Sequence, residues 1–459
     1  MKEVDIHRVY FLGIGGIGMS ALARYFNSKG KDVAGYDRSS TFLTDQLVGE
    51  GMEIHFKDDS SNIPDIYRNA QNTLVVYTPA IPVSNSEYKY FIENGYKLMK
   101  RAQVLGKIME MHKVIAVAGT HGKTTISSMI TQIFTHSGTA CNAFLGGIAK
   151  NFNSNLVLDR NSDFFIAEAD EYDRSFLTLF PDSAVVSSLD DDHLDIYGER
   201  KNLVASFNQF ISQVKPNGVL ILKNGVDLNI PPGRKVFRYA LKVKTDYYAF
   251  DIIRKGLYYE FSIHTPSGDY TKIKLGVHGM LNIENAVAAW AVAHQAGIGV
   301  NAISDALQHY QGVQRRFEIK INNENTLFID DYAHHPEELR AFITSVREII
   351  PGKKITGIFQ PHLYSRTRDF AAGFSKSLSL LDNVVLLDIY PAREQPVPGV
   401  SSELIFEGLK NKGVKINCSK EQVFKVVEEL KPEVLLTMGA GDIDQIVDPL
   451  KELLIRMKS

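Results

Sequence analysis

Cysteine is nearly absent from this chain of 459 residues, and so are the other marks of a secreted or membrane-bound protein. Cys141 and Cys418 are far apart in the sequence, which argues against a disulfide framework and favours a reducing compartment. No apolar run approaches the roughly 18 residues of a membrane-spanning helix. Residues 1–8 carry charges on both sides of apolar residues, unlike a signal peptide. We expect a cytoplasmic protein without membrane insertion.

An excess of charge is also missing, because the formal net charge is only −2. This balance gives no general attraction to nucleic acid or to an anionic membrane, so neither is an expected partner. Any anionic ligand must then be held by local sites. We find no repeats and no low-complexity segment. The 44% hydrophobic and 23% charged composition is that of a globular protein, and the length suggests roughly three domains.

Apolar strands alternate with helical patterns along the chain, which predicts an α/β protein of three domains. The expected boundaries give domains 1–110, 111–313 and 314–459. The first and third show the alternation of a Rossmann-like parallel sheet. The second adds strands with antiparallel spacing at Tyr247–Phe250, Gly256–His264 and Tyr270–Gly276.

The most informative segment is VIAVAGTHGKTT, residues 114–125, an apolar strand that runs into a phosphate-binding loop. Gly119 and Gly122 let backbone N–H groups turn toward an anion, Lys123 adds positive charge, and the Thr124 hydroxyl suits Mg²⁺. A helix over Thr125–His136 would point its N-terminus at the same phosphates. The spacing departs from GxxxxGK[ST], because Val117 stands where that pattern has glycine. The segment predicts binding of ATP or GTP.

A second glycine loop follows the first strand, where Gly13, Gly15 and Gly18 match GxGxxG and Asp37 lies nineteen residues further on. This is the dinucleotide fingerprint, so an NAD-dependent dehydrogenase is one interpretation. A nucleotide diphosphate sugar would satisfy the loop equally well, and tight strand–helix packing needs no ligand at all. A nearby loop, Thr78–Pro82, exposes backbone groups beside it. Ser84 and Asn85, which come shortly after this loop, could contact a ligand or cap a helix.

Acidic residues follow two strands of the central domain. The strand Asp163–Glu168 ends near Asp170, Glu171 and Asp173, and the strand Ser183–Ser188 is followed by Asp190, Asp191, Asp192 and His193. In phosphate-loop proteins a carboxylate at a neighbouring strand end holds the Mg²⁺ that bridges the phosphates. Glu168 is the favoured candidate, and the second cluster suggests a two-metal site. His193 is either a metal ligand or the partner of a carboxylate.

Four polar segments of the third domain are each expected between a strand and a helix. They are Arg315–Glu318, Asp330–Pro336, Gln360–Arg368 and Gly439–Asp442. Each alone would pass for a surface loop, but loops at the carboxyl ends of parallel strands share one edge of a sheet. Arginines at such an edge suit carboxylates and phosphates. We therefore expect one ligand-binding edge.

Taken together and in order, these motifs resemble the Mur ligases, the ATP-dependent amide-forming family of bacterial cell-wall synthesis. The resemblance covers nearly the whole chain through FLGIGGIGMS, AGTHGKTT, EADEYDRSFL, DDDHLDIY, HGMLNIENAVAA, RRFE, DDYAHHP, QPHLYSRTRDF, DIYPAREQPVPGVSS and GAGDI. It is strongest for the branch that joins L-alanine to UDP-N-acetylmuramate. The resemblance implies that the first glycine loop holds the UDP-sugar rather than NAD, with ATP as co-substrate and two Mg²⁺ ions.

The resemblance also assigns roles to residues of this sequence. It places ATP on the phosphate loop and on distant residues (Gly119, Thr120, His121, Gly122, Lys123, Thr124, Thr125, Asn282, Asn285, Arg316 and Asp331). It places the UDP-sugar on the first domain (Gly13, Gly15, Gly16, Ile17, Gly18, Asp37, Thr78, Ala80 and Ile81). It assigns metal binding to Thr124, Glu168 and His193. It assigns binding of the amino acid to Tyr332, His362, Tyr364 and Arg366. The catalytic residues that it implies are Lys123, Glu168, His193, His335, His362 and Arg366.

Two positions separate this chain from some relatives. Phe207 stands where several sister ligases use a carbamylated lysine, which fits the L-alanine branch. Leu363 stands where some relatives carry arginine, so Arg366 or Arg368 would supply the carboxylate contact. His335 or His362 could accept the proton of the incoming amine. Because ATP would touch the second and third domains, we expect domain closure to assemble the site in a monomer or weak homodimer.

Three other interpretations remain. Within the family, a recycling ligase joins a preformed tripeptide to the same UDP-sugar. A dehydrogenase would explain the first glycine loop, but it leaves the Lys123 loop and the acidic strand ends without a role. A non-catalytic phosphate-loop module would need neither the first glycine loop nor the histidines of the third domain.

Overall fold

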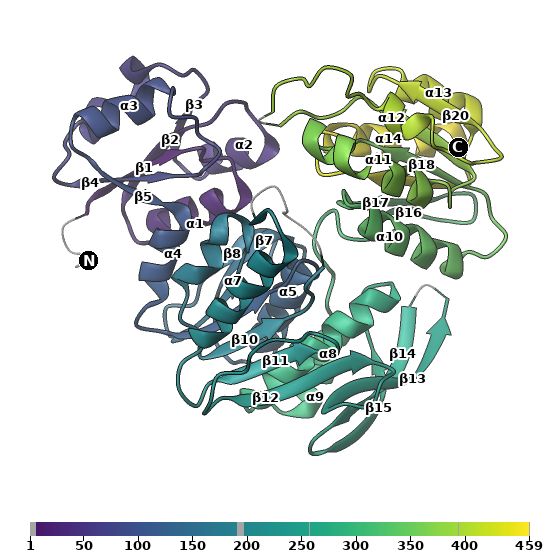
Figure 1. The fold of residues 1–459 in the computed structure, drawn as a ribbon, viewed down its shortest axis with the longest axis horizontal. Helices are drawn as coiled ribbons and strands as arrows, with labels where there is room; N and C mark the ends of the chain where they lie inside the picture. The colour runs from purple at the N-terminus through teal and green to yellow at the C-terminus, as the bar shows by residue number, and fades with distance from the viewer. Residues whose placement is uncertain (1–5, 191–196, 257, 393, 459) are drawn as a thin grey trace. The chain divides into compact units, whose positions relative to one another are not determined.

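The structure is a computed structural model that describes residues 6–190, 197–256, 258–392 and 394–458. Figure 1 shows the described chain as a ribbon with its helices and strands labelled. The chain divides into two compact units. The first consists of residues 1–253, 260–277 and 281–312, and the second consists of residues 313–459 with 254–259 and 278–280. Within the described ranges, no helix has both the length and the apolar composition that a membrane crossing requires.

The first unit opens with a five-stranded parallel sheet in the order β3-β2-β1-β4-β5. Its strands are β1 (Arg8–Leu12), β2 (Asp32–Tyr36), β3 (Glu53–His55), β4 (Thr73–Tyr77) and β5 (Lys97–Lys100), and its helices are α1 (Ile17–Ser28), α2 (Phe42–Gly49), α3 (Ser86–Glu93) and α4 (Arg101–Met109). Side chains alternate in β1, where Val9 and Phe11 join one core and Tyr10 and Leu12 join another. The strand order confirms the Rossmann-like fold of this part.

A ten-stranded sheet forms the rest of the first unit, in the order β15-β14-β13-β12-β11-β10-β6-β9-β7-β8. Its strands are β6 (Lys113–Ala118), β7 (Asn142–Ala149), β8 (Ser154–Val157), β9 (Phe164–Glu168), β10 (Ser183–Val186), β11 (Val219–Lys223), β12 (Lys235–Leu241), β13 (Tyr247–Lys255), β14 (Tyr258–Thr265) and β15 (Gly268–Lys274). The helices are α5 (Lys123–His136), α7 (Arg200–Ser212), α8 (Met280–Gln295) and α9 (Val300–Gln308). The centre is parallel, and β14 pairs antiparallel with β15, which confirms the added antiparallel region.

The second unit holds a six-stranded sheet in the order β16-β17-β21-β18-β19-β20. Its strands are β16 (Glu318–Asn322), β17 (Leu327–Asp331), β18 (Ile355–Phe359), β19 (Asn383–Leu387), β20 (Lys415–Cys418) and β21 (Val434–Met438). The helices are α10 (Pro336–Ile349), α11 (Tyr364–Leu378), α12 (Glu403–Phe406), α13 (Val423–Leu430) and α14 (Asp444–Lys458). Helices cover both faces, because α10 and α11 contribute to one core cluster and α13 and α14 to another. Within the described residues of this sheet, β16 pairs antiparallel with β17, and the other neighbouring strands pair parallel. This confirms the second Rossmann-like domain.

A buried carboxyl group lies beneath the first sheet. Glu87 of α3 is fully buried and accepts a hydrogen bond from the Tyr10 hydroxyl at 2.7 Å, while the Tyr10 hydroxyl also lies 2.9 Å from His55 Nε2. Burial raises the pKa of Glu87 to about 7, although the Tyr10 hydrogen bond opposes the shift. Burial also lowers the pKa of His55. The folded chain therefore holds a proton on Glu87 at pH values where the unfolded chain does not.

Replacing Glu87 with glutamine should change how stability depends on pH. Because the folded pKa is raised from 4.5 to about 7, the wild-type chain loses stability as pH rises through that window. The neutral amide removes this loss, which is about 3 kcal/mol for such a shift. The melting temperature of E87Q should rise relative to that of the wild type as pH increases from about 4.5 to about 7. A difference in melting temperature that is constant across this range would contradict the assignment.

Candidate active site

The loop between β6 and α5 has the backbone geometry of an anion site. Gly119 has φ +126° and Gly122 has φ +85°, and L side chains rarely adopt either conformation. Gly122 is the N-cap of α5, which begins at Lys123, two residues before the start that the sequence predicts. The loop therefore brings free helix N–H groups and a positive helix end to one place.

The strand β10 supports this loop through two serines. The Ser188 hydroxyl accepts a hydrogen bond from His121 N–H at 2.8 Å and lies 2.8 Å from the Thr120 hydroxyl. The Ser187 hydroxyl donates to the carbonyl of His121. These two serines were not among the residues predicted for the site. Their position directly after a strand that adjoins β6 is the signal that could have found them.

The variant Gly119→Ala should disable the loop. A Cβ atom at this position would lie 2.3 Å from Ser187 Oγ and 2.8 Å from the backbone nitrogens of Ser187 and Ser188, in addition to the unfavourable φ. We expect loss of ATP binding by at least about tenfold, since strain of a few kcal/mol must be relieved by moving the loop. Gly138→Ala is the matched control, because that glycine also has positive φ but open space around it. Equal ATP affinity of the two variants in calorimetry would refute the expectation.

Lys123 is held in the site by a buried carboxylate. Its Nζ donates to both oxygens of Glu171 at 2.9 Å and to the carbonyl of Gly119 at 2.8 Å. Glu171 is fully buried. Burial acts to lower the pKa of Lys123, but the carboxylates of Glu171, Asp170 and Glu168 outweigh it, so the pKa is raised. Lys123 is therefore a fixed cation, and the sequence did not reveal which carboxylate pairs with it.

Oxygen atoms suited to Mg²⁺ lie beside this lysine. The Thr124 hydroxyl donates to Glu168 Oε2 at 2.8 Å, so the two predicted ligands are adjacent. Gly146 on β7 leaves the space for this carboxylate, since a Cβ there would lie 2.0 Å from Glu168 Oε2. A hydroxyl and a carboxylate oxygen form a donor set that Mg²⁺ accepts when phosphates complete its coordination. The residues present therefore fit Mg²⁺.

The second acidic cluster is described only in part. Asp190 N–H donates to the Thr120 hydroxyl at 3.1 Å, and His121 Nε2 lies 3.6 Å from an Asp190 carboxylate oxygen. The predicted metal ligand His193, with Asp191 and Asp192, lies outside the described residues. Beyond them, the Tyr197 hydroxyl donates to the carbonyl of Glu171 at 2.6 Å. This bond connects the segment after His193 to the partner of Lys123.

Asn285, which was predicted to contact ATP, lies against the phosphate loop. A Cβ on Gly122 would be 2.9 Å from Asn285 Oδ1. The Asn285 amide lies 3.4 Å from Asn282 Oδ1 on the same face of α8. Phe207 is fully buried on α7 and packs edge-on against Phe176 with ring centroids 5.1 Å apart. Phe207 is thus a core residue.

The first glycine loop is built around Asp37. Gly15 N–H donates to Asp37 Oδ2 at 2.7 Å, and Gly13 has φ +86°. The helix α1 begins at Ile17 with Gly16 as its N-cap, both residues are exposed, and no side chain caps this end of the helix. The predicted neighbours also adjoin this loop, because a Cβ on Gly13 would contact Thr78 and Ile81. Asn85 is a helix cap, since its side chain accepts from Tyr88 N–H at 2.9 Å.

Arg101 is a cation of this region that the sequence did not single out. It is the first residue of α4, and a Cβ on Gly18 would lie 2.8 Å from its guanidinium. One guanidinium nitrogen is 3.9 Å from Asp170 Oδ2, in the acidic segment after β9. The glycine loop and the acidic segment therefore share a neighbour. No motif in the sequence indicates that Arg101 would contact both segments.

In the second unit, loops from several strands meet at one edge of the sheet. Arg315 donates to Asp330 Oδ2 at 3.0 Å and to the carbonyl of Gly439 at 2.6 Å. Gln360 donates to Asp442 Oδ1 at 2.7 Å. The expectation that Arg315 follows a strand was wrong, because it precedes β16. The segment still reaches the edge, since β16 runs antiparallel to β17 and begins where β17 ends.

Asp331 and His334 are half-buried ionisable groups at this edge. Asp331 accepts from Phe317 N–H at 2.6 Å and from Ala333 N–H at 2.8 Å, and burial raises its pKa to about 6. The guanidinium of Arg316 opposes that shift and stacks over Tyr332 at 5.0 Å. Burial also lowers the pKa of His334 to about 4, so this imidazole is neutral near pH 7.

The remaining histidines and Arg366 surround His334. The His362 ring centroid lies 6.1 Å from that of His334, and His362 stacks on Tyr390 at 5.8 Å. Arg366 contributes to the lowered pKa of His334, which places its charge nearby, whereas Arg368 is exposed and paired with Asp369 at 2.7 Å. His335 is 7% exposed and packs edge-on against Phe370. Tyr364 is half-buried at the first turn of α11.

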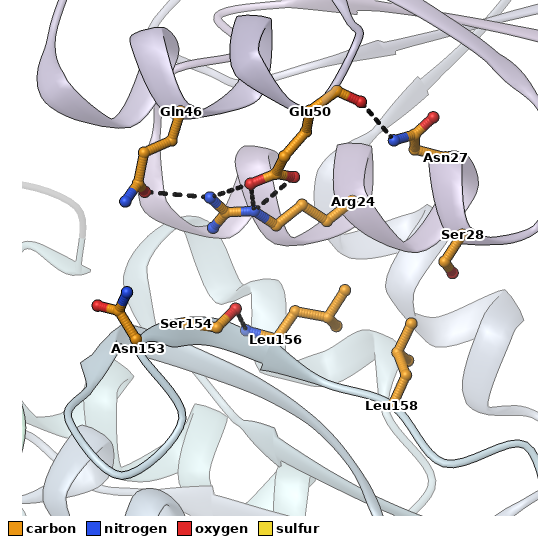
Figure 2. A pocket seen from close by; sticks show the side chains of 9 residues that line it. All are labelled: Arg24, Asn27, Ser28, Gln46, Glu50, Asn153, Ser154, Leu156 and Leu158. Carbon is orange, nitrogen blue, oxygen red and sulfur yellow. Dashed lines mark hydrogen bonds and ion pairs between the residues drawn. The ribbon is translucent and has the colours of Figure 1, made fainter.

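A pocket of about 670 Å³ lies elsewhere in the first unit, between α1, α2 and the β7–β8 hairpin (Figure 2). Arg24 is its central cation. The Arg24 guanidinium is already bonded to Glu50 at 2.7 Å, Gln46 at 3.1 Å and Asn155 at 2.6 Å. Asn155 in turn donates to the carbonyl of Ile17 at 2.6 Å. These bonds connect the first sheet with the second. The charged side chains that line the pocket, Arg24 and Glu50, are paired with each other.

Comparisons with known proteins agree along the chain. Models described as "Mur ligase family, catalytic domain", "Mur ligase middle domain" and "Mur ligase, glutamate ligase domain" match residues 8–113, 117–293 and 315–441. The UDP-N-acetylmuramate–L-alanine ligase of Porphyromonas gingivalis is 50% identical over 97% of this chain and 99% of its own length.

Solved structures give the same result. The crystal structure of UDP-N-acetylmuramate-alanine ligase from Thermotoga maritima is 26% identical and superposes with a TM-score of 0.83 over 98% of this chain and 99% of its own. A murein peptide ligase from Psychrobacter arcticus, at 21% identity, shares the fold with a TM-score of 0.72 and 98% coverage of both chains. The three model matches and the full-length relatives show that the chain belongs to the Mur ligase family.

Proposed function

We propose that this protein joins L-alanine to the lactyl carboxylate of UDP-N-acetylmuramate in the cytoplasm, using ATP and releasing ADP and phosphate. The observation that carries the proposal is the 50% identity to a ligase of that name over 97% of the chain. The half-buried Lys123, the Thr124–Glu168 pair and the exposed N-terminus of α1 provide the chemistry that such a reaction requires. A dehydrogenase would need neither Lys123 nor the Thr124–Glu168 pair.

The reaction proceeds in two displacements. A carboxylate oxygen of the sugar attacks the γ-phosphorus of ATP, and the bond to the β,γ-bridging oxygen breaks, which gives an acyl phosphate and ADP. The uncharged amine of L-alanine then attacks the acyl carbon. A tetrahedral intermediate collapses with loss of inorganic phosphate, and the amine nitrogen gives up a proton. The first step brings two anions together, and the second builds negative charge on the oxygen of the tetrahedral intermediate, so fixed cations lower both barriers.

Lys123 meets this need on the phosphate side. Its ammonium is 2.9 Å from both Glu171 oxygens, so it is ordered and charged before ATP binds. The backbone N–H groups of 119–124 hold the β- and γ-phosphates, and Asn282 and Asn285 contact the adenine. Thr124 and Glu168 are the residues that would hold Mg²⁺, and His193 would serve a second ion. When bound, Mg²⁺ neutralises charge on the phosphates.

The other proposed subsites follow the three domains, 1–110, 111–313 and 314–459. The pyrophosphate of the UDP-sugar lies on the glycine loop and the N-terminus of α1, with Thr78, Ala80 and Ile81 beside it. Arg101, next to Gly18, adds a cation there. In the second unit, Arg316 and Asp331 bind ATP, while Tyr332, His362, Tyr364 and Arg366 bind L-alanine. His335 and His362 are the candidate proton acceptors, and the half-buried His362 is the more accessible of the two.

Arg366→Ala should selectively weaken use of L-alanine. Arg366 is half-buried beside the neutral His334, whereas Arg368 is exposed and paired with Asp369. Loss of a guanidinium–carboxylate contact is worth roughly 1.5–3 kcal/mol, so KM for L-alanine should rise about 10- to 100-fold. KM for ATP should stay within about twofold in steady-state assays. Arg368→Ala is the control, and an equal rise of KM in both variants would contradict the assignment.

The experiment that tests the function is phosphate release from Mg-ATP with each substrate omitted in turn. Release should require UDP-N-acetylmuramate and L-alanine together. Release with the tripeptide L-alanyl-γ-D-glutamyl-meso-diaminopimelate in place of L-alanine would assign the recycling ligase. No release with either amine would remove the ligase proposal.

A further inference from the structure

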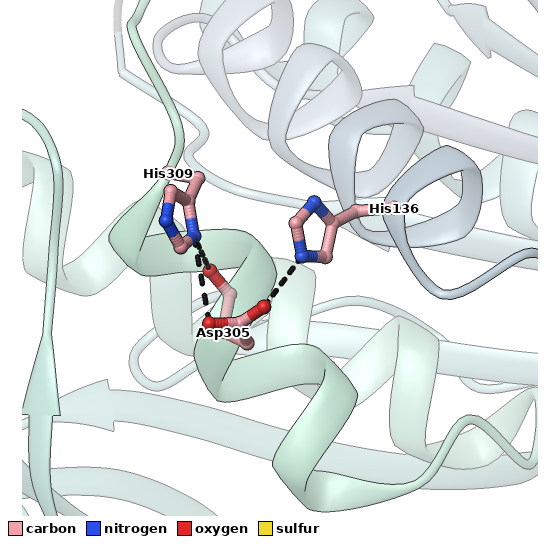
Figure 3. A group of neighbouring side chains, drawn as sticks. All are labelled: His136, Asp305 and His309. Atoms are coloured by element: carbon pink, nitrogen blue, oxygen red, sulfur yellow. Dashed lines mark hydrogen bonds and ion pairs between the residues drawn. The ribbon is translucent and has the colours of Figure 1, made fainter.

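A second group of metal-binding side chains lies at the far end of α5 from the phosphate loop (Figure 3). His136 is the last residue of α5. Asp305 lies on α9, and His309 is the C-cap of that helix, one turn further on. One ligand atom from each side chain can be chosen so that all three lie within 4.8 Å of one another.

The carboxylate lies between the two imidazoles. His136 Nε2 is 2.6 Å from Asp305 Oδ2, and His309 Nδ1 is 3.5 Å from Asp305 Oδ1. The two rings are stacked, with centroids 5.5 Å apart and planes inclined by 17°. Because residues four apart share one face of a helix, α9 presents Asp305 and His309 to His136 together.

The electrostatic surroundings favour a cation. Both α5 and α9 end at this group, so the partly negative carbonyl ends of two helices face it. All three residues are exposed, so an ion can enter from solvent.

We propose that His136, Asp305 and His309 bind one late transition-metal ion, with Zn²⁺ as the ion that the site prefers. Two imidazoles and one carboxylate are a common Zn²⁺ ligand set, with water in the fourth position, whereas Mg²⁺ prefers oxygen ligands. His309 Nδ1 also lies 2.9 Å from the backbone carbonyl oxygen of Asp305, so this ring either turns or uses Nε2 when it binds the ion. We therefore expect the affinity of this site for Zn²⁺ to be weaker than that of a buried, preformed metal site.

The site is separate from the proposed ATP chemistry. α5 has 14 residues, and a helix of that length spans about 20 Å, so the ion would lie roughly that far from Lys123 and Thr124. Metal binding here would join α5 to α9, which pack against each other. The proposal does not depend on the ligase function, and its test needs no substrate.

The test uses tag-free full-length protein that has been stripped with EDTA and dialysed. Co²⁺ is titrated as a spectroscopic probe in excess Mg²⁺, which occupies the oxygen-rich ATP site, and Zn²⁺ is then added as a competitor. We expect one Co²⁺ per chain with the intense visible absorption of tetrahedral coordination, displaced by Zn²⁺. His136→Ala and His309→Ala should each weaken binding by about 10- to 100-fold.

Two controls separate this site from others. His264→Ala removes a histidine that pairs with Asp269 at 2.6 Å elsewhere in the first unit, and Thr124→Ala alters the ATP site, so both should bind Co²⁺ as the wild type does. If an alanine variant fails to fold, Asp305→Asn keeps the side-chain shape and should still weaken binding. Unchanged affinity in the double variant H136A/H309A, or no saturable Co²⁺ binding, would overturn the proposal and leave a hydrogen-bonded pair of helix ends.

Discussion

Replacement of Lys123 by alanine should lower ATP-dependent ligation by roughly 10³-fold, which corresponds to about 4 kcal/mol of transition-state stabilisation. The substitution removes a half-buried cation that lies 2.9 Å from the oxygens of the fully buried Glu171, at the first residue of α5. Lys113→Ala is the matched control, because Lys113 is exposed at the opposite end of the same strand, β6. Single-turnover measurements with saturating ATP report the chemical step rather than binding.

The variant also leaves Glu171 buried without its ion-pair partner, which can cost 3–5 kcal/mol of stability. Lost activity alone would therefore be ambiguous. The double variant K123A/E171Q removes the unpaired charge as well, so it should recover the thermal stability of the wild type but not its activity. If K123A/E171Q turned over at a rate within tenfold of the wild type, Lys123 would have no part in the phosphoryl transfer.

Glu168→Gln should shift the Mg²⁺ dependence of the reaction. The amide keeps a side-chain oxygen beside the Thr124 hydroxyl, 2.8 Å away in the wild type, but it removes the negative charge that an ion needs. We expect the Mg²⁺ concentration for half-maximal activity to rise about 10- to 100-fold, with a fall of kcat of similar size at fixed Mg²⁺.

Asp163→Asn is the control for this variant, because Asp163 is an exposed carboxylate just before β9, at the opposite end of the strand from Glu168. Activity is measured across a Mg²⁺ titration with ATP held constant. A Mg²⁺ titration curve for E168Q that superposes on that of D163N would rule out Glu168 as a ligand. A loss that excess Mg²⁺ does not reduce would place Glu168 in a structural role.

The fold could be predicted where the chain follows regular periodicity. Strands such as β18, over Ile355–Phe359, have the bounds that the sequence suggests, because they are short apolar runs between turn residues. The strand β7 was missed, since Gly146 and Gly147 lower its strand propensity. Gly146 is present because the Glu168 carboxylate occupies the space that a side chain would fill. The local sequence pattern around Gly146 cannot show that a distant carboxylate requires this space.

The candidate site was predictable in its loops but not in its side-chain partners. The phosphate loop follows from the order of Gly119, Gly122 and Lys123 along the chain. The pairing of Lys123 with Glu171 does not, because the segment after β9 is irregular, with Asp173 at φ 51° and Arg174 at φ 54°. Neither a period of two nor one of 3.6 residues indicates where such side chains point. Partners of this kind can be assigned only from coordinates.

The most direct test of the central claim is the mass of the nucleotide-sugar product when the protein is offered ATP, UDP-N-acetylmuramate and an equimolar mixture of L-alanine and the tripeptide L-alanyl-γ-D-glutamyl-meso-diaminopimelate. We predict a product heavier than UDP-N-acetylmuramate by one alanyl residue, formed with one ADP per amide bond. A product that carries only the tripeptide, or ATP hydrolysis without an amide product, would contradict the account.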